Sequence, residues 1–281
     1  CVFMARERMF FPALSQFLER AYIVILLFVV WFMDLDFYFF LLLFPGAGLT
    51  RAVVQSIALH WPGLPEHFFR QLFSSNMRLI YAQGSQMLAV EFLALIYFRI
   101  DIFMLSKMAG LSETGLYQIA YKVFDFSIAV FAGYLLALFP TISRKEKNTR
   151  MFGMTLIGLI VVLPVSLFII WMRIPILSLF GPEYVQASKV LILLMLSLPL
   201  VFITSILANY AIATNCVGFL VKLAAILAFT NILLNWLLIS KYAILGAAIS
   251  TFICEIMSLF ILLGKFKYFY KHQPAAVGVS I

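Results

Sequence analysis

Apolar runs of about 20 residues recur along the chain and are separated by short polar segments. A helix of that length spans the hydrocarbon core of a bilayer and satisfies its own backbone hydrogen bonds there. The pattern therefore predicts an all-α, polytopic transmembrane helical bundle of about eight spans. The expected spans are residues 11–33, 37–59, 78–105, 115–140, 152–172, 187–212, 217–240 and 243–264.

Proline and glycine interrupt this pattern. Pro45 and Gly46 predict a kink or break in the second span, and Pro164 and Pro199 lie inside the fifth and sixth. Such residues are tolerated in a membrane when neighbouring helices satisfy the freed backbone groups. Residues 60–77 form the longest polar interruption, and we expect a cytoplasmic linker with an amphipathic helix on the membrane surface.

This linker divides the chain unequally. We expect residues 1–59 to be the last two spans of an incomplete N-terminal lobe and residues 78–264 to be a complete six-helix C-terminal lobe. Residues 265–281 are expected to form a basic cytoplasmic tail. No small-residue cleavage motif follows the first residues, so we expect no signal peptide. Because the chain begins with Cys1 and not with Met, we expect a fragment of a longer protein.

Composition and charge support a protein embedded in lipid. Of the 281 residues, 64% are hydrophobic and only 11% are charged, which leaves too little polar surface for a soluble domain. Lys and Arg favour the cytoplasmic ends of spans, and here they alternate consistently, with eleven in one set of connections and four in the other. Both termini are therefore expected in the cytoplasm. The net charge of +8 indicates attraction to anionic membrane lipid and not a nucleic-acid partner.

Charged side chains inside the expected spans are the candidate functional residues, because ionised groups there usually face a bundle interior or a water-filled cavity. Asp101 and Lys122 lie at similar depth on neighbouring spans, about 10–15 Å inside the outer boundary. Lys122 and Asp125 share one helix face, whereas Arg99 and Asp101 lie about 200° apart on theirs. At most one of the latter two can therefore face the fourth span.

Three interpretations of these charges stay open. An ion pair between the third and fourth spans could clamp the two helices, the remaining charge could line a central aqueous cavity, or Arg99 could extend to the interface. Gln83, Met87 and Glu91 recur at four-residue spacing and indicate either a cavity wall or a single Gln–Glu contact. Three further charged residues favour a helix-end or inter-helix contact: Glu19, Arg20 and Glu255.

Motifs for catalysis are not found in the sequence. It contains no Gly-rich phosphate loop, no HExxH and no Asp-rich metal cluster. Cys1, Cys216 and Cys254 have neither metal-ligand nor disulfide spacing. We therefore expect no catalytic residue, no metal and no cofactor, and a path for a substrate instead of a reaction centre.

Five segments resemble the Wzx-type O-antigen and polysaccharide flippases of the multidrug/oligosaccharidyl-lipid/polysaccharide exporter superfamily. "RIDIFMLSKMAGLSETGLYQIAYKVFD" (99–125) and "LFPTISR" (138–144) are similar to the start of the family's second lobe. "LFGPEYVQAS" (179–188) resembles its external hairpin, "NILLNWLLISKYAILGAAISTFICE" (231–255) its last two spans, and "ARERMFFPALSQFLER" (5–20) the entry into its fifth span. Because the family has two six-helix lobes, four opening spans would be missing here.

The resemblance implies a transporter, not an enzyme, in a bacterial inner membrane. It would flip an undecaprenyl-diphosphate-linked oligosaccharide, such as an O-antigen unit of lipopolysaccharide, from the cytoplasmic to the periplasmic leaflet by alternating access. Arg99, Lys122 and Arg20 would supply cationic charge along the substrate path, and Asp101, Asp125 and Glu91 would balance it or couple transport to an ion. Further implied partners are a polysaccharide polymerase and a chain-length regulator.

Other functions remain as alternatives at this point. A drug or metabolite antiporter, or a lipid II flippase of the same superfamily, would share these spans. A Wzy-like membrane polymerase would need a long periplasmic loop, and no connection in the sequence is long enough. An inactive fragment is the remaining alternative.

Overall fold

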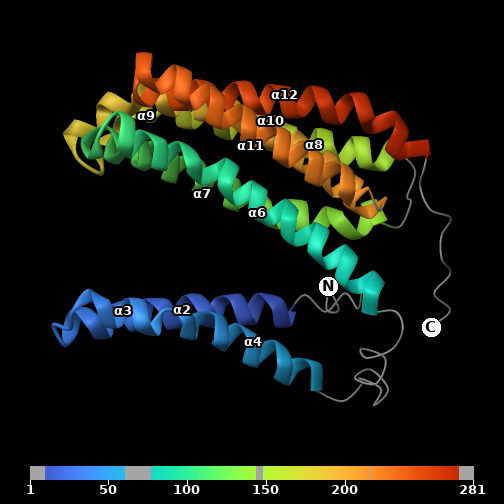
Figure 1. Ribbon diagram of the computed structural model, residues 1–281, viewed down its shortest axis with the longest axis horizontal. Helices are drawn as coiled ribbons and strands as arrows, with labels where there is room; N and C mark the ends of the chain where they lie inside the picture. Colours follow the sequence, from blue (N-terminus) through green and yellow to red (C-terminus); the bar gives the residue numbers. More distant parts are fainter. Residues whose placement is uncertain (1–9, 61–76, 144–147, 215, 272–281) are drawn as a thin grey trace. The chain divides into compact units, whose positions relative to one another are not determined.

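The computed structural model describes residues 10–60, 77–143, 148–214 and 216–271, and their regular secondary structure is entirely helical (Figure 1). Each of the eight predicted apolar segments is helical, which confirms the all-α class. The helices are α2 (Phe10–Phe32), α3 (Phe37–Leu43), α4 (Pro45–His60), α6 (Met77–Met108), α7 (Leu111–Ser143), α8 (Asn148–Trp171), α9 (Arg173–Ser178), the 3-10 helix η1 (Pro182–Ala187), α10 (Ser188–Ala213), α11 (Val217–Tyr242) and α12 (Ile244–Lys271).

Four stretches of the described residues are long and apolar enough to cross a membrane: Leu14–Phe32, Pro182–Ala213, Val217–Tyr242 and Ile244–Phe266. Two apolar helices are shorter, Tyr38–Val54 and Thr155–Trp171. Helices α6 and α7 have 32 and 33 residues but carry charged and polar side chains along their length. The chain is therefore a membrane protein with four candidate spans, and the other four expected spans remain a prediction.

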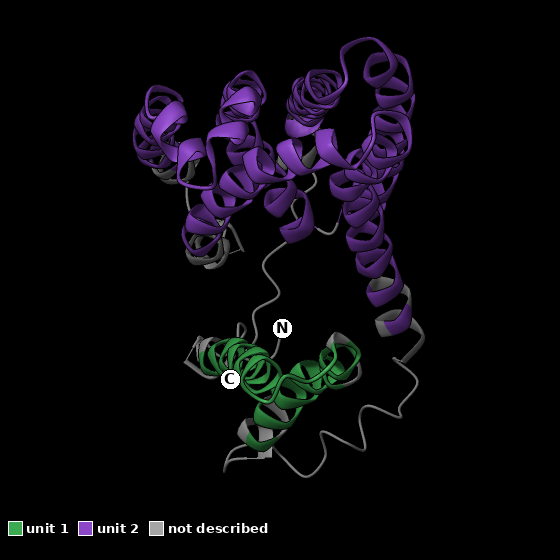
Figure 2. Cartoon of the chain, turned by 90° about the vertical axis from the view of Figure 1, so that its left-hand side faces the viewer, with its two compact units in different colours: residues 1–78 green, residues 79–281 purple. Residues whose placement is uncertain are grey.

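The chain divides into two compact units, residues 1–78 and residues 79–281 (Figure 2). We call them unit 1 and unit 2. Most of the predicted linker lies outside the described residues, and so does the last part of the predicted tail. Helix α12 continues to Lys271, so the first residues of that tail belong to a helix.

In unit 1, α2 packs against a helical pair that is interrupted where the sequence predicts a break. Helix α3 ends at Leu43 and α4 begins at Pro45. The amide of Ala47 donates to Phe44, which leaves the Leu43 carbonyl oxygen free, and the hydroxyl of Tyr22 in α2 donates to that oxygen at 3.1 Å. A Cβ at Gly46 would lie 2.5 Å from this hydroxyl oxygen. Gly46 thus makes room for Tyr22, whose hydroxyl satisfies the Leu43 carbonyl group at the interruption between α3 and α4.

In unit 2, α10 is the central helix and packs against α7, α8 and α12. Large apolar side chains of α10, among them Leu194, Met195 and Phe202, are buried. Pro199 has no N–H to donate to the carbonyl four residues earlier, that of Met195. The hydroxyl of Ser166 in α8 donates to this oxygen instead. Helix α10 is therefore continuous through Pro199, because Ser166 of the neighbouring α8 replaces the lost hydrogen bond.

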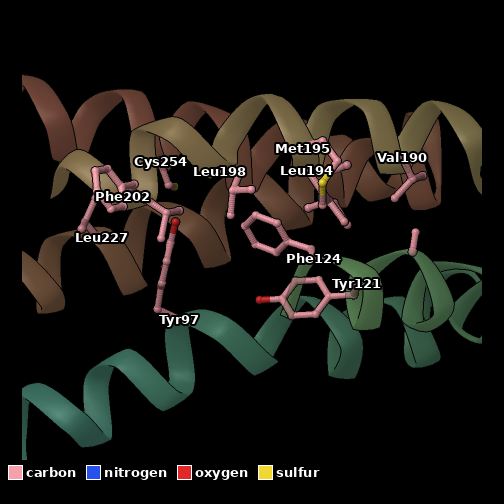
Figure 3. Close-up of a cluster of buried hydrophobic side chains, with 14 of the residues drawn as sticks. Tyr97, Tyr121, Phe124, Val190, Leu194, Met195, Leu198, Phe202, Leu227 and Cys254 are labelled. Carbon is pink, nitrogen blue, oxygen red and sulfur yellow. The ribbon is translucent and has the colours of Figure 1, made fainter. Parts of the chain in front are cut away.

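Helix α6 joins unit 2 differently. Its backbone does not run close along that of any other described helix, and its contacts with the core are made by large side chains. Figure 3 shows Tyr97 extending from α6 towards Cys254 of α12, and Tyr121 and Phe124 arising from α7. Tyr97 and Leu105 of α6 are buried in this cluster. The charged residues of α6 are positioned by these contacts.

Candidate functional site

An ion pair links α6 to α7. Nη2 of Arg99 donates to Oδ2 of Asp125 at 3.2 Å, and the guanidinium carbon lies 5.7 Å from the centre of the Tyr121 ring. The side chains of Arg99 and Asp125 are 53% and 39% exposed. This inter-helix pair is one of the arrangements that the sequence left open. It is accessible from outside unit 2.

Asp101 has the opposite environment. It is 1% exposed, accepts a hydrogen bond from the hydroxyl of Tyr117 in α7, and also accepts from the amide of Ile102 at 2.7 Å. Arg99 therefore faces outwards and Asp101 faces the interior, in keeping with their separation of about 200°. Both nevertheless contact α7, so the prediction that at most one of them could face the fourth span is wrong: the long side chains of Arg99 and Tyr117 bridge the two helices, one on each side. Because Lys122 is exposed on α7, Asp101 and Lys122 are not brought together.

A second tyrosine–carboxylate pair connects α6 to α12. The hydroxyl of Tyr97 donates to Oε1 of Glu255 at 2.8 Å, and both side chains are buried. This is the kind of inter-helix contact expected for Glu255. A carboxyl group buried in an apolar bundle is costly without a hydrogen-bond donor, so Tyr97 stabilises this position. The two tyrosines hold α6 against the rest of unit 2.

Two buried asparagines lie on α11. Nδ2 of Asn235 donates to Oδ1 of Asn231 at 2.9 Å, whereas Oδ1 of Asn235 is buried without a hydrogen-bond partner among the described residues. Sequence reasoning did not select these residues or Tyr97 and Tyr117. For the asparagines, the signal available was their polar character at four-residue spacing within an apolar helix, which places Asn231 and Asn235 on one face.

One face of α7 is largely exposed, and its composition differs from that of a lipid-facing surface. Its members recur at spacings of three and four residues and are small, polar or charged: Gly115, Gln118, Lys122, Asp125, Ala129 and Gly133. We call them the α7 polar stripe. A Cβ added at Gly115 or Gly133 would meet nothing within 4 Å, so these glycines are not needed for close packing within unit 2. Exposed Phe126 and Val130 border the stripe.

The remaining predicted residues lie elsewhere. Glu91 is exposed on α6, and the side chain of its expected neighbour Gln83 lies outside the described part of the structure. Arg20 is exposed on α2 of unit 1. Beside it, Oε2 of Glu19 lies 3.5 Å from Nη1 of Arg51 in α4. Sequence reasoning missed Arg51, although a positive charge in an apolar segment was itself the signal.

The chemistry available at this site is the binding of an anion or of a polar chain. Among the described residues, no group of three or more His, Cys, Asp and Glu side chains is arranged to hold a metal ion. Arg99 and Lys122 provide exposed cationic donors, and Gln118 adds an exposed amide that can donate and accept.

The sequence profile of the polysaccharide biosynthesis protein family matches residues 2–146, just over half of the chain. The chain belongs to this family. The matched residues include all of α6 and α7, and thus Arg99, Asp125 and the α7 polar stripe. Membership gives the chain a role in polysaccharide biosynthesis and confirms the sequence resemblance at that level.

A relative in this family is the capsular polysaccharide biosynthesis protein CapF of Staphylococcus aureus. It is 36% identical over 129 residues, which cover 45% of this chain and 31% of the relative. The aligned part of the chain thus spans about a third of the relative's length. No solved structure matches the chain.

Proposed function

We propose that this polysaccharide biosynthesis protein is a transporter of a lipid-linked oligosaccharide. It moves a surface polysaccharide unit, attached to undecaprenyl diphosphate, from the cytoplasmic to the outer leaflet of a bacterial inner membrane. The family's role supports the substrate class. No covalent bond of the substrate changes, so the protein acts without catalytic residues, metal or cofactor.

The observation that carries this proposal is the exposed charge on α6 and α7. Arg99 precedes the end of α6 by nine residues and Lys122 follows the start of α7 by eleven, which corresponds to about 14 and 17 Å along the helices. At that depth in a bilayer, hydrocarbon is a costly surrounding for a charged side chain. Water or a polar substrate is therefore the medium that suits this face.

This reading requires α6 and α7 to be membrane spans. In the proposed arrangement, the chain has eight spans. Residues 78–264 form a six-helix lobe, and residues 1–59 are the last two spans of another lobe. Two lobes that rock against each other around a polar path produce alternating access. The diphosphate and the sugars follow the path while the isoprenoid tail remains in lipid.

Each candidate residue has a role in the proposed path. Arg99, Lys122 and Arg20 bind the diphosphate and the sugar hydroxyls, because cationic donors form strong, charge-assisted hydrogen bonds to phosphate. Asp125 and Glu91 balance this positive charge, and the buried Asp101 is the candidate for coupling transport to an ion. A polysaccharide polymerase and a chain-length regulator are the partners that would receive the flipped unit.

Complementation tests the function. The protein is expressed in a bacterium whose own polysaccharide flippase is deleted. We expect surface polysaccharide to return and lipid-linked units to stop accumulating in the inner leaflet, as measured by surface staining and by extraction of labelled lipid. Drug resistance without polysaccharide would identify an antiporter instead. Longer chains without a change in unit export would identify a polymerase.

The proposed orientation, with both termini in the cytoplasm, predicts a labelling pattern. Single cysteines are introduced into a variant without Cys1, Cys216 and Cys254, and intact cells are treated with a membrane-impermeant maleimide. A cysteine within residues 107–113 should be labelled, and one within residues 144–150 should be labelled only after the cells are permeabilised. The reverse pattern would invert the orientation.

A further inference from the structure

The Arg99–Asp125 pair is made by a single contact. Among the described residues, the guanidinium donates one recorded hydrogen bond, at 3.2 Å to Oδ2 of Asp125. A guanidinium carries five N–H donors, and the side chain of Arg99 is 53% exposed. Most of its donor capacity therefore remains available to an anion that approaches from outside unit 2.

The position of Arg99 does not depend on Asp125 alone. The guanidinium carbon lies 5.7 Å from the centre of the Tyr121 ring, within the range of a cation–π contact. Tyr121 is buried and packs against Tyr117 and Phe124, with ring centres 5.6 and 5.7 Å away. A fixed aromatic ring thus supports the guanidinium even when the carboxylate moves away.

A diphosphate is a stronger partner for Arg99 than this carboxylate. Exposed ion pairs contribute little to stability because water screens them and both side chains lose freedom. A diphosphate carries more negative charge and can accept two parallel N–H bonds from one guanidinium. Both anions need the same donors, so they compete for them.

We infer that Asp125 is an internal competitor that occupies the anion position of Arg99 between transport cycles. The diphosphate of the substrate displaces the carboxylate on binding, and the carboxylate returns as the substrate leaves. A transporter must bind its substrate weakly enough to release it, as a conducting channel does with its ion. Asp125 is thus a positioning residue that limits affinity. This inference rests on the proposed function.

Binding of radiolabelled undecaprenyl diphosphate to the full chain in lipid nanodiscs tests this inference. Replacing Asp125 by Asn, or by Ser as a second neutral variant, should tighten binding about fivefold, equivalent to about 1 kcal/mol. Glu113→Gln is the matched control, because it removes one negative charge from the same helix away from Arg99. It should leave affinity unchanged. In the Arg99→Ala background, Asp125→Asn should no longer tighten binding, because the two residues act through one interaction.

Transport kinetics separate this role from a structural one. Asp125→Asn should lower both the KM and the kcat of flipping, since tighter binding slows release. A merely structural role would lower kcat or stability without tightening binding. Unchanged or weaker binding in both neutral variants, while Arg99→Ala weakens binding, would overturn the inference and leave the proposed function intact. If the wild-type chain binds no undecaprenyl diphosphate, the proposed function fails and this inference fails with it.

Discussion

Replacing Arg99 and Lys122 together by alanine is expected to abolish surface polysaccharide while the protein still inserts into the membrane. Hydrogen bonds to charged groups contribute about 1.5–3 kcal/mol each, so the loss of two cationic donors should reduce transport about a hundredfold or more. Surface staining of cells that carry the double variant measures the effect, and blotting of the membrane fraction verifies insertion. Each single variant should show a smaller loss.

Two other lysines provide matched controls. Lys107 lies in the last turn of α6 and Lys189 near the start of α10, and both are exposed. The variant Lys107→Ala/Lys189→Ala loses the same charge as Arg99→Ala/Lys122→Ala, but at helix ends, which the proposed topology places at the membrane surface. We expect it to retain normal polysaccharide. Normal polysaccharide from Arg99→Ala/Lys122→Ala as well would remove both residues from the substrate path.

The sequence predicted the helices well because the membrane leaves few alternatives. Apolar runs of spanning length must be helical where no water can satisfy the backbone. The break at Pro45 followed from the missing N–H of proline. Its compensation did not follow, because the Tyr22 hydroxyl and the Leu43 carbonyl are 21 residues apart and meet only when α2 packs against α4.

In the candidate site, too, some features follow from the local sequence and others depend on how the helices pack. Helical geometry places Arg99 and Asp101 on opposite faces without any structure. Which of them faces the interior depends on Tyr117 and Asp125, whose positions result from how α7 packs. The contact between Tyr97 and Glu255 joins residues 158 positions apart. No local pattern encodes a partner at that distance.

Helices α6 and α7 are not among the described stretches that are apolar enough to cross a membrane by composition alone. Their charged residues give them less apolar character than α10, α11 and α12, although they are longer. Of the charges on these two helices, Asp101 accepts a hydrogen bond from the buried Tyr117, and Arg99 pairs with Asp125. Side chains that are satisfied in this way are compatible with a span whose other face is apolar.

The close approach of α11 and α12 depends on Gly246. A single residue, Ala243, connects the two helices, and its φ of 47° turns the chain sharply. A Cβ at Gly246 would collide with the carbonyl group of Leu238 and lie 2.8 Å from the amide nitrogen of Ile239. These are backbone atoms of α11, so no rotation of a side chain can relieve the collision. The two helices would have to separate.

Gly246→Ala is therefore expected to lower the free energy of unfolding by about 1–3 kcal/mol, the usual range for overpacking a close contact. Gly264→Ala is the matched control on the same helix, since a Cβ there would meet nothing within 4 Å. It should be neutral or slightly stabilising, because alanine favours helix more than glycine does. The buried thiol of Cys254 reports unfolding when it reacts with a fluorogenic maleimide in a variant without the other cysteines. We expect the Tm to fall by about 2–4 °C for each kcal/mol lost in Gly246→Ala. Equal Tm values for the two alanine variants would mean that α11 and α12 do not approach closely at Gly246.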